Sequence, residues 1–239
     1  MSADPHEHLR EAISAVDWAG SVAAFSTDTA TLQALSSSSL RLAIWCHAIE
    51  GAEAGNPALP FVRSAQVEMQ YVAALLALSL YRPAAASMRA MVEGVLYYSY
   101  YRCHPSELRS LLSPDSKFYV DKKEIVDWHK AHTPGFAVRS EVVGLHDSMN
   151  RWYSRVSAIT HGQLPGIWAS HSELAGVHPD AAIMTTAIAE YVAGVEVAHK
   201  FLLSTVEVAV WSRFQASERK AILKGLSKPD VQSVGLSVL

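Results

Sequence analysis

Long alanine-rich windows with few proline or glycine breaks are the feature that most constrains the fold of this chain. Alanine and leucine favour helices, and such windows recur along most of the 239 residues. Half of the residues are hydrophobic, which is ample for a buried core. No strand is strongly signalled and no internal repeat is visible. The sequence therefore predicts an all-α fold built as a single helical bundle.

Apolar periodicity and helix-breaking residues place the expected helices along the chain. These helices cover residues 5–20, 32–53, 61–80, 83–104, 105–112, 120–132, 141–161, 180–214 and 217–225. The tail at 228–239 lacks a convincing period and is expected to be irregular. The connection at 162–179 is longer than most ordered loops, and long loops in compact domains are commonly functional or mobile. We expect an N-terminal helical extension at 1–59, a helical core at 60–214, and a C-terminal helix and tail at 215–239.

Charge and cysteine content limit the functional classes. The formal net charge is −3 and the pI is about 6.4, so the chain as a whole has no positive field that would hold nucleic acid. Any nucleic-acid role must rest on a local site. Two cysteines without a CxxC pair, and an N-terminus without a signal pattern, predict a cytoplasmic protein. The apolar run at 71–81 is too short to cross a bilayer, so no membrane partner is expected. Glycine-rich phosphate loops are absent, and no cofactor is predicted.

One segment, RWYSRVSAITHG at 151–162, carries an arrangement suited to chemistry. On a helix, Tyr153, Ser157 and His161 form one polar stripe, because residues four apart lie on the same face. Gly162 is typical of the residue just past a helix end. His161 would then lie among the terminal carbonyls, where the helix dipole favours a protonated imidazole. We therefore interpret His161 as a candidate proton donor.

The spacing of Arg155 and His161, with five residues between them, resembles the Arg-x(4–6)-His motif of the HEPN superfamily of helical domains. The helix RAMVEGVLYY at 89–98 and the segment WYSRVSAITHG at 152–162 are similar to uncharacterised bacterial HEPN-like proteins. The resemblance covers mainly residues 60–214. It implies a metal-independent endoribonuclease of a bacterial antiviral-defence or toxin–antitoxin system, acting on RNA as a homodimer, with an antitoxin or defence protein as a further partner.

The resemblance also implies site residues. Arg155 and His161 of two chains would surround one phosphate, with Tyr153, Ser157 and Arg151 in support. A ribose 2′-hydroxyl would attack the phosphate, with His161 as general acid or base and Arg155 stabilising negative charge. Catalytic members usually have a polar residue after the motif arginine, whereas this chain has Val156. The alternative is a non-catalytic helical module that binds a partner protein or nucleotide through the same groove or the loop at 162–179, with His161 serving only to cap its helix.

Three other patterns need an interpretation. Arg89 and Glu93 lie four apart in an apolar segment, which predicts a structural ion pair. His129 and His132 lie three apart on a predicted helix and are weak candidates for a metal site, because no third ligand has a defined spacing. The tyrosines at 97–101 are compatible with base stacking, but aromatic residues at helical spacing more often belong to a core.

Overall fold

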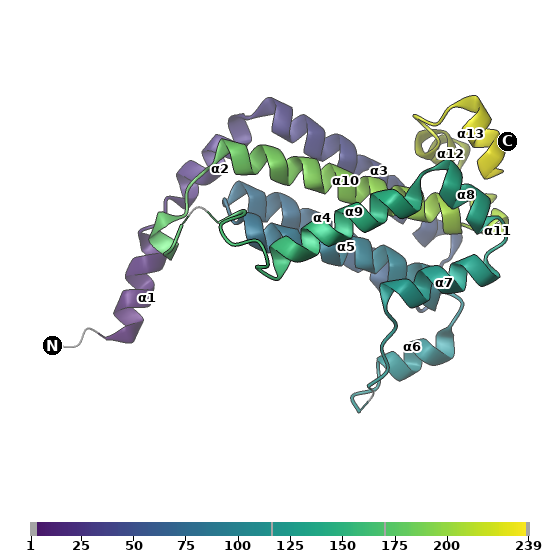
Figure 1. The fold of residues 1–239 in the computed structure, drawn as a ribbon, viewed down its shortest axis with the longest axis horizontal. Coiled ribbons are helices and arrows are strands. Elements are labelled where there is room, and N and C mark those ends of the chain that lie inside the picture. The colour runs from purple at the N-terminus through teal and green to yellow at the C-terminus, as the bar shows by residue number, and fades with distance from the viewer. Residues whose placement is uncertain (1–3, 116, 170, 238–239) are drawn as a thin grey trace.

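The computed structural model describes residues 4–115, 117–169 and 171–237 and confirms the all-α fold, since helices and connections account for all of this described part (Figure 1). Five long helices form the bundle, and shorter helices pack at its ends. In chain order the helices are α1 (Pro5–Ser14), α2 (Trp18–Thr27), α3 (Thr29–Ala52), α4 (Leu59–Ala77), α5 (Tyr81–Tyr101), α6 (Pro105–Leu111), α7 (Lys122–His132), α8 (Phe136–Val142), α9 (Leu145–Thr160), the 3₁₀ turn η1 (Leu174–Gly176), α10 (Ala181–Thr205), α11 (Val208–Trp211), α12 (Ala216–Ile222) and α13 (Lys228–Val234).

Helices α5 and α10 form the centre of the bundle. Helix α5 packs against α4, α9 and α10, and α10 packs in addition against α3. Fully buried side chains on both helices, such as Met88, Met91, Tyr191 and Phe201, supply much of the core. Among the described residues, α10 is also the one helix long and apolar enough to cross a membrane by length and composition alone, and nearly half of its most apolar window is buried inside the bundle.

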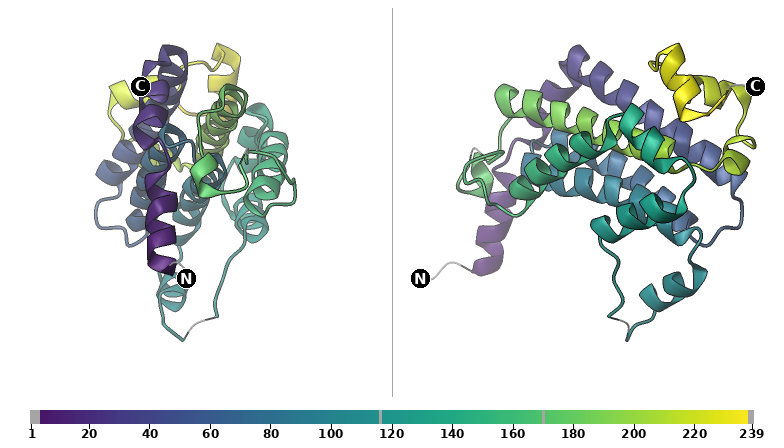
Figure 2. Two further views of the ribbon diagram at one scale, coloured as in Figure 1. Left: turned by 90° about the vertical axis from the view of Figure 1, so that its left-hand side faces the viewer. Right: turned by 45° about the vertical axis from the view of Figure 1, so that its right-hand side comes forward.

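Helix α3 belongs to the bundle. Trp45 is fully buried, and its indole N–H donates to His199 of α10 at 2.9 Å. The predicted boundary between residues 59 and 60 falls in the first turn of α4, a helix that packs against α3. What projects from the body is α1, and Figure 2 shows it leaving the bundle at one end.

Four of the expected elements differ in the structure. The helix expected at 5–20 is two helices, because α1 ends at Ser14 and Asp17 caps α2 by accepting from the Gly20 N–H at 2.7 Å. The helix expected at 141–161 is two helices, because Gly144 adopts φ 61° and separates α8 from α9. The helix expected at 180–214 ends at Thr205, where the Val206 carbonyl accepts a hydrogen bond from the buried Arg139 at 2.7 Å. Most of the tail expected to be irregular forms α13, which Ser227 caps by accepting from the Asp230 N–H.

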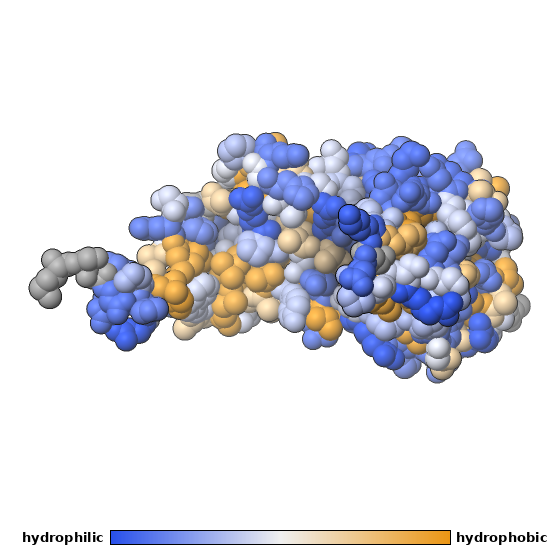
Figure 3. Space-filling view, turned by 90° about the horizontal axis from the view of Figure 1, so that it is seen from below, coloured by the Kyte–Doolittle hydropathy of each residue, from blue (hydrophilic) through white to orange (hydrophobic). Residues whose placement is uncertain are grey.

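Exposed apolar side chains are concentrated near α1. Leu9 and Ile13 of α1 are 60% and 45% exposed, and Ile167 and Leu174 of the connection between α9 and α10 are also exposed. Figure 3 shows apolar side chains gathered on the surface at the end of the molecule next to α1. Helix α1 contacts the bundle mainly through η1, so it buries little of its own apolar surface.

Helices α4 and α5 approach most closely at Gly94. A Cβ at this position would lie 2.9 Å from the backbone oxygen of Phe61, a contact that requires the helices to separate. We expect Gly94→Ala to lower the free energy of unfolding, because overpacking costs about 1–3 kcal/mol against a gain of about 1 kcal/mol in helix propensity. Gly51→Ala in α3 is the matched control, since its Cβ would meet nothing within 4 Å. Urea unfolding followed by circular dichroism should show a lower free energy of unfolding for Gly94→Ala and no decrease for Gly51→Ala. An equal increase in stability in both variants would contradict the close approach of the helices at Gly94.

Candidate functional site

Helix α9 ends at the motif segment in a well-formed cap. The Gln163 N–H donates to the Ala158 carbonyl and the Gly162 N–H donates to the Ile159 carbonyl, which together form a Schellman motif. Gly162 has φ 67°. The predicted helix end is therefore confirmed, and His161 lies exposed at the last turn of α9.

Arg89 of α5 reaches the imidazole of His161. Its Nη1 donates to His161 Nε2 at 2.9 Å and lies 3.5 Å from Ser157 Oγ. Its Nε donates to Glu93 Oε1 at 2.8 Å. The predicted Arg89–Glu93 pair is thus present, and it also aims a guanidinium at the histidine. We call Arg89, Glu93, Ser157 and His161 the Arg89–His161 cluster.

The role of His161 in this contact follows from its partner. A guanidinium has only hydrogen-bond donors, so His161 Nε2 is the acceptor. Burial lowers the pKa of Arg89, but the hydrogen bond and the charge of Glu93 outweigh burial, and the pKa is raised. The lone pair of His161 is therefore covered by a permanently charged group. An anion that draws Arg89 away would leave His161 Nε2 free to accept a proton.

A cleft of about 530 Å³ opens beside this cluster, between α5, α7 and α9. Its walls combine cations with aromatic rings: Arg89, Lys122 and Lys123 with Tyr97, Tyr119 and Tyr153. Two acids, Glu93 and Asp121, also line it. The predicted stripe of Tyr153, Ser157 and His161 therefore faces this cleft and the cluster at its edge. A cleft lined by cations and aromatic rings, with a histidine at its edge, suits a ligand that has both a phosphate and a ring.

Arg155 points to another part of the surface. Its Nε donates to Glu190 Oε1 of α10 at 2.8 Å. A groove of about 270 Å³ between α9 and α10 is lined by Arg155 together with Arg151, another predicted support residue. Burial raises the pKa of Glu190 and the charge of Arg155 opposes that rise. Within one chain, Arg155 is thus paired with Glu190, and the guanidinium that contacts His161 belongs to Arg89.

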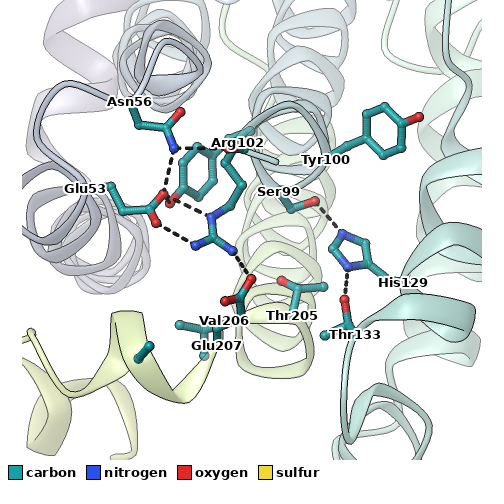
Figure 4. Close-up of polar contacts among 12 residues, drawn as sticks. Glu53, Asn56, Ser99, Tyr100, Arg102, His129, Thr133, Thr205, Val206 and Glu207 are labelled. Carbon is teal, nitrogen blue, oxygen red and sulfur yellow. Dashed lines mark hydrogen bonds and ion pairs between the residues drawn. The ribbon is translucent and has the colours of Figure 1, made fainter. Parts of the chain in front are cut away.

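His129 is a core residue. It is 2% exposed, and its two ring nitrogens lie 2.9 Å from Ser99 Oγ and 2.7 Å from Thr133 Oγ1, as Figure 4 shows. Both nitrogens are engaged by hydroxyl groups, so His129 does not face His132 in the arrangement that a shared metal would need. Within the ranges that the structure describes, no group of three His, Cys, Asp or Glu side chains is placed to hold a metal ion.

Stability should depend on pH through His129 and His199. Burial first, and nearby cations second, lower the pKa of both to about 3. Because the unfolded chain takes up these protons near pH 6.5 and the folded chain does not, the free energy of unfolding should be constant at higher pH and should fall as the pH drops from about 6.5 toward 3. Between pH 7.5 and 5 we expect a loss of about 2 kcal/mol per histidine. Urea unfolding at the two pH values measures this loss.

The exposed His47 provides the control for this pH dependence. His47→Ala should leave this loss of stability in place, because it leaves both buried imidazoles untouched. A wild-type profile that stays flat between pH 7.5 and 5 would contradict the neutral buried state of His129 and His199.

The tyrosine run contributes mainly to the core and to a polar network. Tyr101 is fully buried, and the Tyr98 hydroxyl donates to Glu53 at 2.8 Å. Arg102 joins the same carboxylate through Nε at 3.0 Å and reaches Glu207 through Nη1 at 2.8 Å (Figure 4). Sequence reasoning missed this network, because Glu53 and Glu207 lie far from Arg102 along the chain.

Sequence reasoning also missed the contact between Arg89 and His161. The available signal was that both segments carry a polar pair at a spacing of four, Arg89 with Glu93 and Ser157 with His161. Two such pairs can contact each other when their helices pack together. Nothing in the sequence indicated that α5 and α9 would pack in this way.

Comparisons with family models, with curated proteins and with solved structures gave no match for this chain. The chemistry of the site therefore has to be inferred from its own geometry.

Proposed function

We propose that this protein is a metal-independent endoribonuclease of the HEPN-like type, in which Arg89 and His161 act on the scissile phosphate. The observation that supports this proposal is the 2.9 Å contact between Arg89 Nη1 and His161 Nε2 at the edge of a cationic cleft. The antiviral-defence or toxin–antitoxin role, and a partner protein within such a system, come from the sequence resemblance alone.

The chemistry begins when the RNA phosphate draws Arg89 away from His161 Nε2. The RNA phosphate binds the guanidinium of Arg89, which stays charged and presents a fork that matches phosphate oxygens. His161 Nε2 then accepts the proton of the ribose 2′-hydroxyl, and the 2′-oxygen attacks phosphorus. The bond to the 5′-oxygen breaks, this oxygen takes a proton from water, and the hydroxide that is left takes up the proton held by His161. Arg89 stabilises the charge that accumulates on the phosphate oxygens in the transition state.

This mechanism has a direct test. Single-stranded RNA incubated with the purified full chain in excess chelator should be cut to fragments with 2′,3′-cyclic phosphate and 5′-hydroxyl ends. The same strand with 2′-deoxy sugars should stay intact, because it lacks the attacking oxygen. Cleavage that requires a divalent metal, or equal cutting of the deoxy strand, would exclude the proposal.

A homodimer remains part of the proposal. Arg151 and Arg155 lie on the groove between α9 and α10, where a second chain would have to present its own His161 for the arrangement that the resemblance implies. Sedimentation of the wild-type chain, with Arg155→Glu as the charge-reversed variant, would show whether this groove lies in an interface.

One observation favours the second candidate, a non-catalytic module that binds a nucleotide or a partner protein. Arg155 is engaged by Glu190, and Val156 is fully buried, so a polar residue could not replace it without leaving an unpaired group in the core. This candidate predicts ligand binding in the cleft with no RNA cleavage under the conditions of the assay above.

A further inference from the structure

Lys122 and Lys123, in the first turn of α7, differ in their partners. Lys123 Nζ forms an ion pair with Asp127 Oδ2 at 2.7 Å. Lys122 lines the cleft, and among the described residues no carboxylate lies within ion-pair distance of its ammonium. The neighbouring Asp121 caps α7 by accepting from the Glu124 N–H at 2.8 Å. The cleft thus holds one cation that the fold leaves without an acidic partner.

The surroundings of Lys122 make this arrangement costly without a ligand. Its Nζ lies 4.5 Å from the centre of the Tyr153 ring, and burial lowers its pKa. An ammonium removed from water without a partner loses solvation free energy that an anion would restore.

Tyr153 provides a second and independent indication of a ligand. Its side chain is 6% exposed and lines the same cleft, and its buried hydroxyl has no hydrogen-bond partner in the described part of the chain. Buried hydroxyl groups are nearly always bonded, so an unpaired one needs an explanation. A ligand oxygen in the cleft would satisfy Tyr153 and Lys122 together.

The cleft also has side chains that suit a planar ring. Tyr119 is 63% exposed, and Tyr97 is half-buried next to it. Exposed aromatic side chains beside cations stack bases in single-strand binders. The amide groups of Asn150 and Gln163 also line the cleft and offer both donors and acceptors to a ring edge. A volume of about 530 Å³ lies within the usual range for a ligand site.

We propose that this cleft binds one nucleoside monophosphate unit, with its phosphate on Lys122 and its base against Tyr119, next to the Arg89–His161 cluster. The inference deepens the proposed function and rests on it for the choice of a nucleotide as ligand. It assigns the cleft to the nucleotide beside the cleaved bond, and it restricts the substrate to single strands because the base has to leave its helical stack.

Isothermal titration of the full chain with adenosine 5′-monophosphate, ribose 5-phosphate and inorganic phosphate tests the assignment. The nucleotide should bind about tenfold more tightly than ribose 5-phosphate, which lacks the base. Lys122→Gln should weaken the binding of all three ligands by about tenfold. Lys130→Gln on the exposed side of α7 is the matched control and should leave their affinities unchanged. Tyr119→Ala should weaken only the nucleotide, and Tyr119→Phe should keep its affinity.

Tyr153→Phe separates a ligand contact from a structural role. Removing a buried hydroxyl that has no partner should leave the urea midpoint unchanged or higher. If the hydroxyl contacts the ligand, the same variant should weaken nucleotide binding several-fold. Unchanged affinity in this variant would remove Tyr153 from the site.

The outcomes separate the two proposals. Nucleotide binding without RNA cleavage would support this inference and exclude the endoribonuclease. RNA cleavage with a KM that is unaffected by Lys122→Gln and Tyr119→Ala would overturn this inference alone. Equal affinity for the nucleotide and for inorganic phosphate, or no binding of either, would also overturn it.

Discussion

Replacing His161 with alanine is expected to slow RNA cleavage by about 100-fold or more, because the 2′-hydroxyl would lose its proton acceptor. Arg89→Ala should cause a loss of about 100- to 1000-fold, since it removes the cation that binds the phosphate and stabilises the transition state. Cleavage of a fluorescent single-stranded RNA under single-turnover conditions measures both effects. The imidazole of His161 is exposed, so its removal should change the free energy of unfolding by about 1 kcal/mol at most.

Three further variants make this prediction specific. His47→Ala and Arg63→Ala remove exposed side chains far from the cleft, each paired with a glutamate, and should cleave at the wild-type rate. Arg155→Ala should keep most of the activity if Arg89 is the arginine that acts. Full activity in Arg89→Ala together with a large loss in Arg155→Ala would instead assign the chemistry to the pair that the sequence motif predicts.

Replacing Arg102 with methionine is expected to lower the free energy of unfolding by about 3–5 kcal/mol, because Glu53 would keep a buried charge without its closest cation, with only Arg213 left at 3.9 Å. The Glu53 side chain is 8% exposed, and its pKa is lowered because the bonds and charge of Arg102, with help from Tyr98, outweigh the effect of burial. Urea unfolding at neutral pH measures the loss. The network joins the ends of α3 and α5 to the start of α11, so the loss should appear in a single cooperative transition.

Two variants test the cause of this loss. Arg63→Met removes an exposed arginine from its pair with Glu50 and should cost less than about 1 kcal/mol. Converting both Glu53 and Arg102 to methionine should recover part of the stability, because no unpaired charge then stays buried. A double variant that is less stable than Arg102→Met would show that the loss comes from packing.

Most of the helices could be predicted from the sequence because their signals are local. Pro5 after Asp4, Pro105 after His104, and Gly162 at the end of α9 act through the backbone of their own residues. Two of the errors arose where a distant contact decides. The end of α10 coincides with the hydrogen bond from Arg139, and α13 is fixed by burial of Val234 against the rest of the chain.

In the candidate site, too, the features within one helix could be predicted and the contacts between helices could not. The stripe of Tyr153, Ser157 and His161 is a property of one helix and was predicted from spacing. The arginine that contacts this stripe could not be predicted from spacing, because 68 residues separate Arg89 from Ser157 along the chain. Arg155 has the right spacing for the motif, yet it lies about 120° from His161 around an ideal helix, and it contacts α10 while His161 contacts α5.

By itself, the sequence determined the all-α class, the capped end of α9, and the polar character of the face that carries His161, because propensity, capping and periodicity depend on neighbours within about one helical turn. Only the tertiary structure decided which charges meet: Arg89 with His161, Arg155 with Glu190, and Arg102 with Glu53. The partners of a charged side chain depend on which helices pack together and on how far each is shifted along the other. Burial of apolar side chains in the core sets this packing, and no local sequence pattern indicates which polar side chains it will bring together at the edge of the core.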